Sequence, residues 1–176
     1  MSQCSYCGAA NIDGVDACEQ CQEPLGESSL MHVDADVEHC LLHDKVVLLL
    51  PRKPICVPPT TTVRSVLETF VDRAIGCVLV TDKERLVGIF TESDAVIRIG
   101  AKIEQLGERP VSEFMTASPE TIELDAEIAY ALQRMDVGGY RHLPVLIGER
   151  VVGVISIRDI LQYLARHLEV VGERIR

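Results

Sequence analysis

The sequence predicts an α/β protein made of a duplicated β-α-β-β-α unit behind a small cysteine-rich segment. Three observations support this fold class: an internal repeat with an offset of 65 residues, apolar strands alternating with amphipathic helices, and two Cys-x-x-Cys pairs near the N-terminus. The repeat is clearest in residues 86–94 and 151–159. Each of these stretches is an apolar strand with one internal glycine, followed by a hydroxyl residue, two further residues and an aspartate.

The repeat continues on both sides of this stretch without a gap. The offset of 65 residues maps Pro54 to Pro119, and it maps Val80 to Val145. The copies are therefore expected at residues 46–110 and 111–170. In copy 1 the hydrophobic periodicity predicts strands at 55–57, 77–81 and 85–90 and helices at 63–73 and 93–99. In copy 2 it predicts strands at 121–124, 143–147 and 151–155 and helices at 126–137 and 158–167, with Thr60 to Thr62 and Asp125 as N-caps.

The composition describes one globular unit with an appendage. The chain has 176 residues, of which 47% are hydrophobic and 25% are charged. The longest apolar run, Val46 to Leu50, is too short to span a bilayer, and the N-terminus carries no secretory signal pattern. We therefore expect a soluble, cytoplasmic protein.

The net charge of −10 belongs to the N-terminal arm. No Lys or Arg precedes Lys45, whereas nine Asp or Glu residues do, and the rest of the chain is nearly neutral. A negative arm repels nucleic-acid phosphates, so a nucleic-acid partner is disfavoured. The arm is more consistent with docking on a protein.

Residues 1–25 predict a structural metal site. Two Cys-x-x-Cys pairs at this distance can place four thiolates in the tetrahedron that Zn²⁺ prefers, and a segment this short cannot bury a core of its own. Two disulfides, or iron in place of zinc, are the alternatives. Residues 26–45 form an acidic linker that can include a short helix. The four metal ligands would be Cys4, Cys7, Cys18 and Cys21.

This segment resembles the short zinc-ribbon family. Cys7-Gly8, Asn11, Gly14 and Leu25 match that family's pattern, while Gln22 stands where the second knuckle usually has glycine. The resemblance implies a structural zinc ion without catalysis.

The repeated strand ends allow two interpretations. Thr91 with Asp94, and Ser156 with Asp159, each have the spacing of a capping box, which would stabilise the following helix by about 1 kcal/mol. The same helix start could instead bind a nucleoside phosphate, with the carboxylate accepting hydrogen bonds from ribose and the hydroxyl donating to phosphate.

Residues 46–168 resemble tandem CBS (cystathionine-β-synthase) domains, because Gly88 to Asp94 and Gly153 to Asp159 both carry the family's Gly-apolar-x-Thr/Ser-x-x-Asp motif. The resemblance implies a pseudo-two-fold pair of copies with two clefts between them. It implies ribose binding by the aspartates and ribose or phosphate binding by the hydroxyls. The residues that it assigns to the ligand are Thr91, Asp94, Ser156, Asp159, the phosphate contacts Arg141, His142 and Arg158, and the base-flanking Val57 and Ile122.

The two sites are not equivalent in sequence. Gly76 and Cys77 occupy the copy 1 positions of Arg141 and His142, and Ser93 occupies that of Arg158. We therefore expect the better phosphate site in copy 2.

The resemblance implies a non-enzymatic sensor of AMP, ADP, ATP or S-adenosylmethionine that forms a homodimer. No catalytic triad, open metal site or carboxylate pair is readable, and Cys77 lies in an apolar strand that favours an inert thiol. A dimerising scaffold without a ligand is the main alternative. A nucleic-acid regulator acting through the zinc ribbon is a weaker one.

Overall fold

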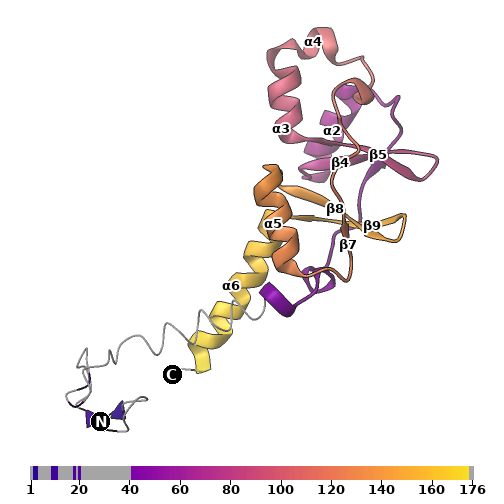
Figure 1. The fold of residues 1–176 in the computed structure, drawn as a ribbon. Coiled ribbons are helices and arrows are strands. Elements are labelled where there is room, and N and C mark those ends of the chain that lie inside the picture. The colour runs from indigo at the N-terminus through magenta and orange to yellow at the C-terminus, as the bar shows by residue number, and fades with distance from the viewer. Residues whose placement is uncertain (1, 4–8, 12–17, 19, 21–40, 175–176) are drawn as a thin grey trace.

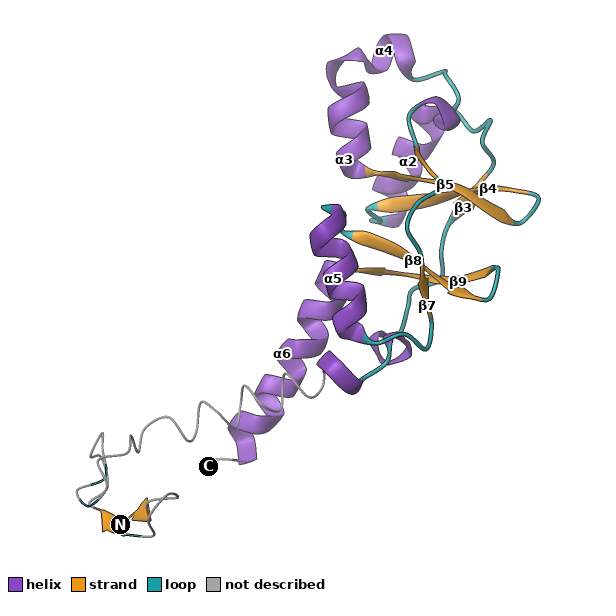
Figure 2. Cartoon of the chain, viewed as in Figure 1, coloured by secondary structure: helices purple, strands orange, loops and turns teal. Residues whose placement is uncertain are grey.

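The computed structural model describes residues 2–3, 9–11, 18, 20 and 41–174. Two small sheets, one from each copy, lie next to each other, and the helices cover one side of them (Figure 1, Figure 2). A separate antiparallel pair, β1 (Ser2–Gln3) with β2 (Ala10–Asn11), lies in the cysteine-rich segment.

Copy 1 follows the predicted order. Its strands are β3 (Cys56–Val57), β4 (Cys77–Asp82) and β5 (Arg85–Thr91), and its first helix, α2, covers Val63–Arg73 as predicted. The Thr62 side chain accepts a hydrogen bond from the Ser65 amide, which confirms Thr62 as the N-cap. The rest of copy 1 consists of α3 (Glu92–Asp94), a π-helical turn η2 (Ala95–Ile99), η3 (Gly100–Lys102) and α4 (Ile103–Leu106). The first elements of copy 2 are η4 (Val111–Glu113) and β6 (Thr116–Ala117), and β6 pairs with β5 of the copy 1 sheet.

Copy 2 has the same order with a longer last helix. Its elements are β7 (Ile122–Glu123), α5 (Ile128–Gly138), β8 (His142–Ile147), β9 (Arg150–Ser156) and α6 (Ile157–Arg174). The turn η1 (Val46–Leu49) begins copy 1 and comes before its first strand.

The two sheets are built alike. In each sheet the first short strand is parallel to the second, and the second is antiparallel to the third. Cys77 pairs with Thr91 and His142 pairs with Ser156, at the offset of 65 residues. Even the irregularity in register recurs, after Val80 in one sheet and after Val145 in the other. The duplication predicted from sequence is therefore confirmed strand by strand.

Each copy packs against the segment that leads into the other copy, which we call a leading segment. Residues 44–52 lead into copy 1 and pack on copy 2, and residues 109–117 lead into copy 2 and pack on copy 1. The amide of Val46 donates to the carbonyl of Ala126 at 2.8 Å, and the amide of Val111 donates to the carbonyl of Thr61 at 2.8 Å. These two bonds are related by the same offset. Val46 is fully buried in the core of copy 2, and Val111 is fully buried in the core of copy 1. This exchange fastens the two copies together.

The exchange also explains a wrong prediction. Asp125 does not cap the first helix of copy 2, which begins at Ile128 after Glu127. The carbonyls of Leu124 and Ala126 accept hydrogen bonds from the amides of residues 47 and 46. Because these long-range bonds hold residues 124–126 outside the helix, the helix starts later than its local sequence suggests.

The recurrence of a glycine at the same position of β5 and β9 is explained by this packing. A Cβ atom on Gly153 would lie 2.5 Å from Cβ of Pro51, and one on Gly88 would lie 2.2 Å from Sδ of Met115. Both distances are too short for a real contact, so the leading segments can cross the strands only where a side chain is missing.

Each copy has its own apolar core, formed by side chains of its strands and its helices. Val78, Phe90 and Val63 are fully buried in copy 1, and Leu143, Ile155 and Ile128 occupy the related positions in copy 2. No helix among the described residues combines the length and the apolar character needed to cross a bilayer.

Candidate functional site

The repeated strand ends are capping boxes in both copies. The hydroxyl of Thr91 donates to Oδ2 of Asp94 at 2.7 Å, and that oxygen also accepts from the Thr91 amide at 3.0 Å. In copy 2 the corresponding bonds from Ser156 to Asp159 are 2.6 and 2.7 Å long. The capping interpretation is therefore confirmed. It uses only one carboxylate oxygen of each aspartate, so a ligand could still be bound through the other.

An arginine lies at the other carboxylate oxygen of each aspartate. In copy 1, Nε of Arg98 is 3.2 Å from Oδ1 of Asp94, four residues earlier on the same helix. In copy 2, a terminal nitrogen of Arg52 is 3.1 Å from Oδ1 of Asp159. Arg52 belongs to the leading segment that crosses β9, and its side chain is 68% exposed. The two aspartates thus have the same cap but different cationic partners.

The basic residues predicted for copy 2 lie close enough to influence His142. Burial lowers the pKa of His142, and the charges of Arg141 and Arg158 act in the same direction, while nearby Asp159 raises this pKa. Arg141, Arg158 and Asp159 therefore each lie close enough to His142 for their charges to act on it. Arg141 and Arg158 are exposed, and His142 is half-buried.

His142 also reaches across to copy 1. A Cβ atom on Gly76 would lie 3.2 Å from Nε2 of His142 and 3.3 Å from a carboxylate oxygen of Glu92. The missing side chain of Gly76 therefore makes room for His142. Glu92, which sequence reasoning missed, brings a negative charge to this cluster.

Val57 and Ile122 lie where the first strands of the two sheets were expected. Val57 is half-buried and packs against the core of copy 1, whereas Ile122 is buried in the core of copy 2. Both side chains contribute to the cores. Their contact with a base stays a prediction.

Cys77 has the properties of an inert thiol. Burial, with a smaller contribution from the charge of Glu92, raises the pKa of Cys77 to about 12. A thiol with this pKa carries almost no thiolate at neutral pH, so Cys77 is a poor nucleophile.

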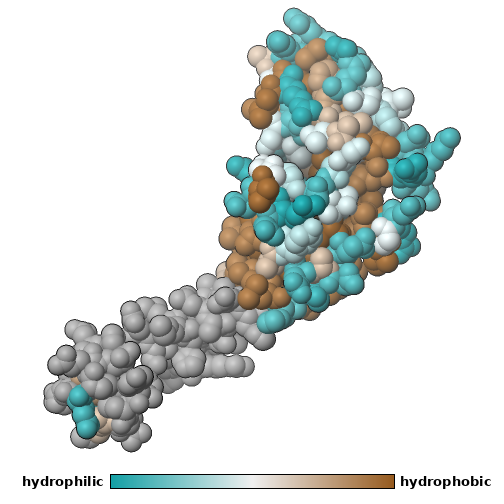
Figure 3. Space-filling model, viewed as in Figure 1, coloured by the Kyte–Doolittle hydropathy of each residue, from teal (hydrophilic) through white to brown (hydrophobic). Residues whose placement is uncertain are grey.

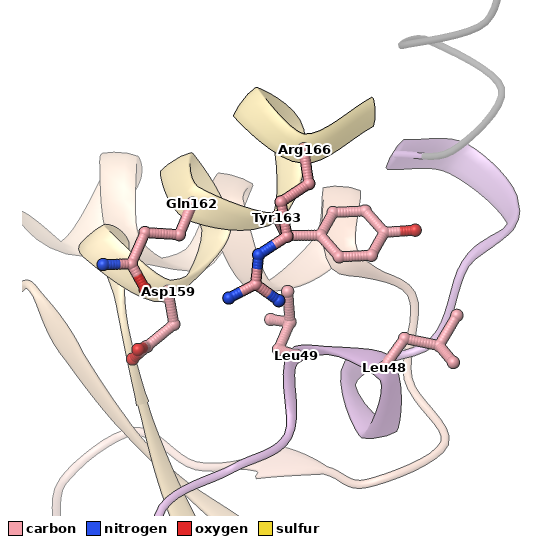
Figure 4. Close-up of a pocket in the computed structure, with 6 residues that line it drawn as sticks. All are labelled: Leu48, Leu49, Asp159, Gln162, Tyr163 and Arg166. Carbon is pink, nitrogen blue, oxygen red and sulfur yellow. The ribbon is translucent and has the colours of Figure 1, made fainter. Parts of the chain in front are cut away.

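A small pocket lies beside Asp159, between α6 and η1 (Figure 4). Its volume is about 30 Å³, far below the 300 Å³ or more typical of ligand sites. Sequence reasoning named only Asp159 among its lining residues. The helical spacing of Gln162, Tyr163 and Arg166 from Asp159 could have indicated these three residues. Nothing in the local sequence indicated that η1 would pack beside them. The pocket is lined by Leu48, Leu49, Asp159, Gln162, Tyr163 and Arg166.

The predicted metal site falls mostly outside the described residues. Cys4, Cys7 and Cys21 lie outside them, and Cys18 is buried. Within the part of the chain that the structure describes, no group of three His, Cys, Asp or Glu side chains is placed to hold a metal ion.

Comparison with known proteins identifies the two copies. The CBS domain family model matches residues 49–100 and 111–166, which together make up more than half of the chain. The chain belongs to the CBS domain family. The resemblance drawn from the two strand-end motifs is thereby confirmed. The zinc ribbon stays a prediction, because the matched residues begin after the cysteine-rich segment.

Relatives of the CBS pair include proteins from plants, bacteria and archaea. CBS domain-containing protein CBSCBSPB1 of Arabidopsis thaliana is 32% identical over 123 residues, covering 69% of this chain and 23% of that protein. The chain spans 20–23% of the length of the first curated relatives that it matches.

Two solved structures show the same fold at 28% identity. The CBS-domain containing protein ATU1752 from Agrobacterium tumefaciens has a TM-score of 0.62, covering 67% of this chain and 94% of that one. CBS domain protein PAE2072 from Pyrobaculum aerophilum, complexed with AMP, has a TM-score of 0.60, covering 69% of this chain and 98% of that one.

Proposed function

We propose that this CBS pair is a non-enzymatic regulatory module that binds an adenosyl ligand beside Asp159. The observation that carries the proposal is a helix-capping carboxylate with an adjacent pocket, at a strand end where two arginines and a histidine lie close to one another. The similar protein PAE2072 is complexed with AMP, which supports an adenine nucleotide as the ligand class. S-adenosylmethionine and ATP are the other candidates.

The chemistry of the site suits a nucleoside phosphate. Oδ2 of Asp159 is committed to the cap, so Oδ1 is the oxygen that would accept hydrogen bonds from ribose hydroxyls. Arg141 and Arg158 would attract the phosphate, His142 could donate a ring N–H to it, and the start of α6 adds the positive end of a helix dipole. The apolar side chains of Leu48 and Leu49 would flank the base.

The ligand would have to open this site. Arg52 holds Oδ1 of Asp159, and the pocket beside it has room for about one water molecule. An exposed ion pair of this kind contributes about 0–1 kcal/mol, so ribose could displace Arg52 at low cost. Displacement would loosen the leading segment of Asp44 to Arg52, which continues from the N-terminal arm. Ligand binding would thus be linked to the position of the arm, because a ligand acts through its different affinity for two states.

Calorimetric titration of the full chain with AMP, ATP and S-adenosylmethionine tests this proposal. We expect saturable heat with at least one of them. The absence of heat with all three at millimolar concentration would contradict sensing and favour the scaffold alternative.

A variant locates the binding site. Asp159→Asn keeps an acceptor for the cap but removes the charge, so it should weaken AMP binding by about 10–100-fold, the range for a hydrogen bond to a charged group. Asp82→Asn, at the exposed end of β4, is the control and should bind AMP like the wild type. Unchanged affinity in Asp159→Asn would remove Asp159 from the site.

We also propose that the module is a homodimer through its helices. Large apolar side chains are exposed on α2, η2, α5 and α6, and Figure 3 shows apolar surface over the helix side. Light scattering after gel filtration should give twice the chain mass, and Ile97→Glu combined with Leu161→Glu should give a monomer. A monomeric wild type would contradict the dimer. The exposed residues are Val71, Val96, Ile97, Val137 and Leu161, between 58% and 82% accessible.

For the N-terminal segment we propose a structural zinc ribbon that docks a protein partner. The residues that join β1 to β2 include Cys4 and Cys7, which is where a ribbon places its first knuckle, and the matching Asn11 is buried and donates to the carbonyl of Ala9 at 3.0 Å. Metal analysis should find one zinc per chain, lost in Cys7→Ser and retained in Cys77→Ser. Iron, or intact disulfides without metal, would overturn the assignment.

A further inference from the structure

We infer that the Arg98 side chain closes the copy 1 site, so that each chain binds a single nucleotide, in copy 2. This inference rests on the proposed function and specifies its stoichiometry. It follows from comparing the pocket beside Asp159 with the corresponding space beside Asp94.

The offset of 65 residues identifies the copy 1 counterpart of the pocket. Asp159 corresponds to Asp94, and Leu49 of η1 corresponds to Phe114, which follows η4. Tyr163 corresponds to Arg98. The counterpart of the pocket is therefore the space between Asp94 on the helix and the backbone of residues 113–115.

Arg98 spans this space. One terminal nitrogen of its guanidinium donates to the carbonyl of Phe114 at 2.6 Å and to that of Met115 at 2.8 Å. The other terminal nitrogen lies 3.4 Å from the hydroxyl oxygen of Thr116, and Nε lies 3.2 Å from Oδ1 of Asp94. One side chain thus joins the ribose-binding oxygen to the opposite wall.

These contacts use most of the donors that a guanidinium has. A ribose that approached Asp94 would have to displace a charged group held at four points. At Asp159 it would displace the ion pair that Arg52 makes with Oδ1. Moreover, freeing Arg98 would leave two backbone carbonyls without these donors, a loss that has no equivalent at Arg52.

The local backbone sets Arg98 in this position. The helix after β5 changes from α3 to the π turn η2 and stops at Gly100, which has a φ of +48°. In copy 2 the residue at the position of Gly100 is Ala165, and α6 continues as a regular helix. Tyr163, at the position of Arg98, donates to the carboxylate of Asp44.

The experiment is a calorimetric titration of the full chain and of Arg98 variants with AMP. We expect one AMP per chain in the wild type. Arg98→Met keeps the length of the stem but removes the guanidinium, and it should bind two AMP per chain. Arg98→Ala is a second variant, and circular dichroism identifies the one that remains folded. Arg85→Ala, an exposed arginine at the start of β5, is the charge control and should keep one AMP.

The outcomes separate the inference from the proposed function. Two AMP per wild-type chain, or one AMP per chain in both Arg98 variants, would overturn the inference while sensing survives. Weaker AMP binding in Arg98→Met would also overturn it, by making Arg98 a ligand contact. If the wild type binds no AMP but Arg98→Met binds one, the closure of copy 1 by Arg98 holds, whereas binding in copy 2 and wild-type AMP sensing fail. If neither protein binds AMP, both are wrong.

Discussion

The two copies share their backbone plan but differ in the helix that follows the repeated strand end. In copy 1 this helix is a short α3, then the π turn η2, and it ends at Gly100. In copy 2, α6 runs without a break from Ile157 to Arg174. Identical caps at Thr91 and Ser156 therefore begin two helices of very different length.

This difference determines what each capping aspartate faces. The unbroken α6 carries Asp159, Gln162, Tyr163 and Arg166 at helical spacing along one side of a pocket. The broken helix of copy 1 instead turns Arg98 onto the backbone of Phe114 and Met115. A duplicated motif thus preserves the fold in both halves, whereas the residues after the motif give the two capping aspartates different surroundings.

The largest expected effect on stability comes from the two strand glycines. Gly153→Ala places Cβ against the rigid ring of Pro51, so it should destabilise the protein by about 1–3 kcal/mol, the range for overpacking. Gly88→Ala places Cβ against the flexible side chain of Met115 and should cost less. Urea unfolding measures both variants. Equal losses would show that the two crossings are packed alike.

The capping boxes should come next in magnitude. Ser156→Ala and Thr91→Ala each remove the hydroxyl from a box and should lower the free energy of unfolding by about 1 kcal/mol. Urea unfolding again provides the measurement. An effect at Ser156 alone would mean that the short helix of copy 1 is held by Arg98 rather than by its cap.

Much of this fold could be predicted because its signals are local. The period of apolar residues and the cap at Thr62 specify α2 to the residue, and the repeated motif gives β5 and β9 with their closing aspartates. The exchange of leading segments was not predictable. Its hydrogen bonds join residues 46–47 to residues 124–126. These residues are far apart in the sequence, and no local sequence pattern predicts that they pair.

The site was predictable to the same extent. Comparing the copies position by position indicated Arg141, His142 and Arg158, and in the structure the charges of both arginines act on His142. Their role in ligand binding stays a prediction. Arg52 and Arg98 were missed for different reasons. Arg52 reaches Asp159 only through the segment exchange, and Arg98 reaches Asp94 at a four-residue spacing that is common on solvated helices.

A smaller effect should appear as a pH dependence from copy 2 alone, since Cys77 occupies the position of His142 in copy 1. Burial lowers the pKa of His142 in the folded state, and Arg141 and Arg158 add to this, while Glu92 and Asp159 oppose it. Between this lowered pKa and the ordinary value of about 6.5, the unfolded chain binds more protons. Stability should therefore fall as pH drops below about 6.5.

Urea unfolding at neutral and mildly acidic pH measures this dependence. His142→Asn should reduce the slope, and His43→Asn, at an exposed histidine that precedes copy 1, serves as the control. The same slope in His142→Asn and in the wild type would show that other groups cause the loss at low pH.

The smallest change in stability is expected at Arg52, whose counterpart at the offset of 65 residues is Ala117. Arg52→Ala removes an exposed ion pair to Asp159, so stability should change by less than about 1 kcal/mol. AMP affinity should rise by up to about fivefold, because ribose no longer competes with a guanidinium for Oδ1. Lys53→Ala removes an exposed charge next to it and should leave AMP affinity near that of the wild type. Weaker AMP binding in Arg52→Ala would instead make Arg52 a ligand contact. Arg52 would then assist binding at Asp159, whereas Arg98 blocks it at Asp94, so the two arginines would differ in function as well as in position along the chain.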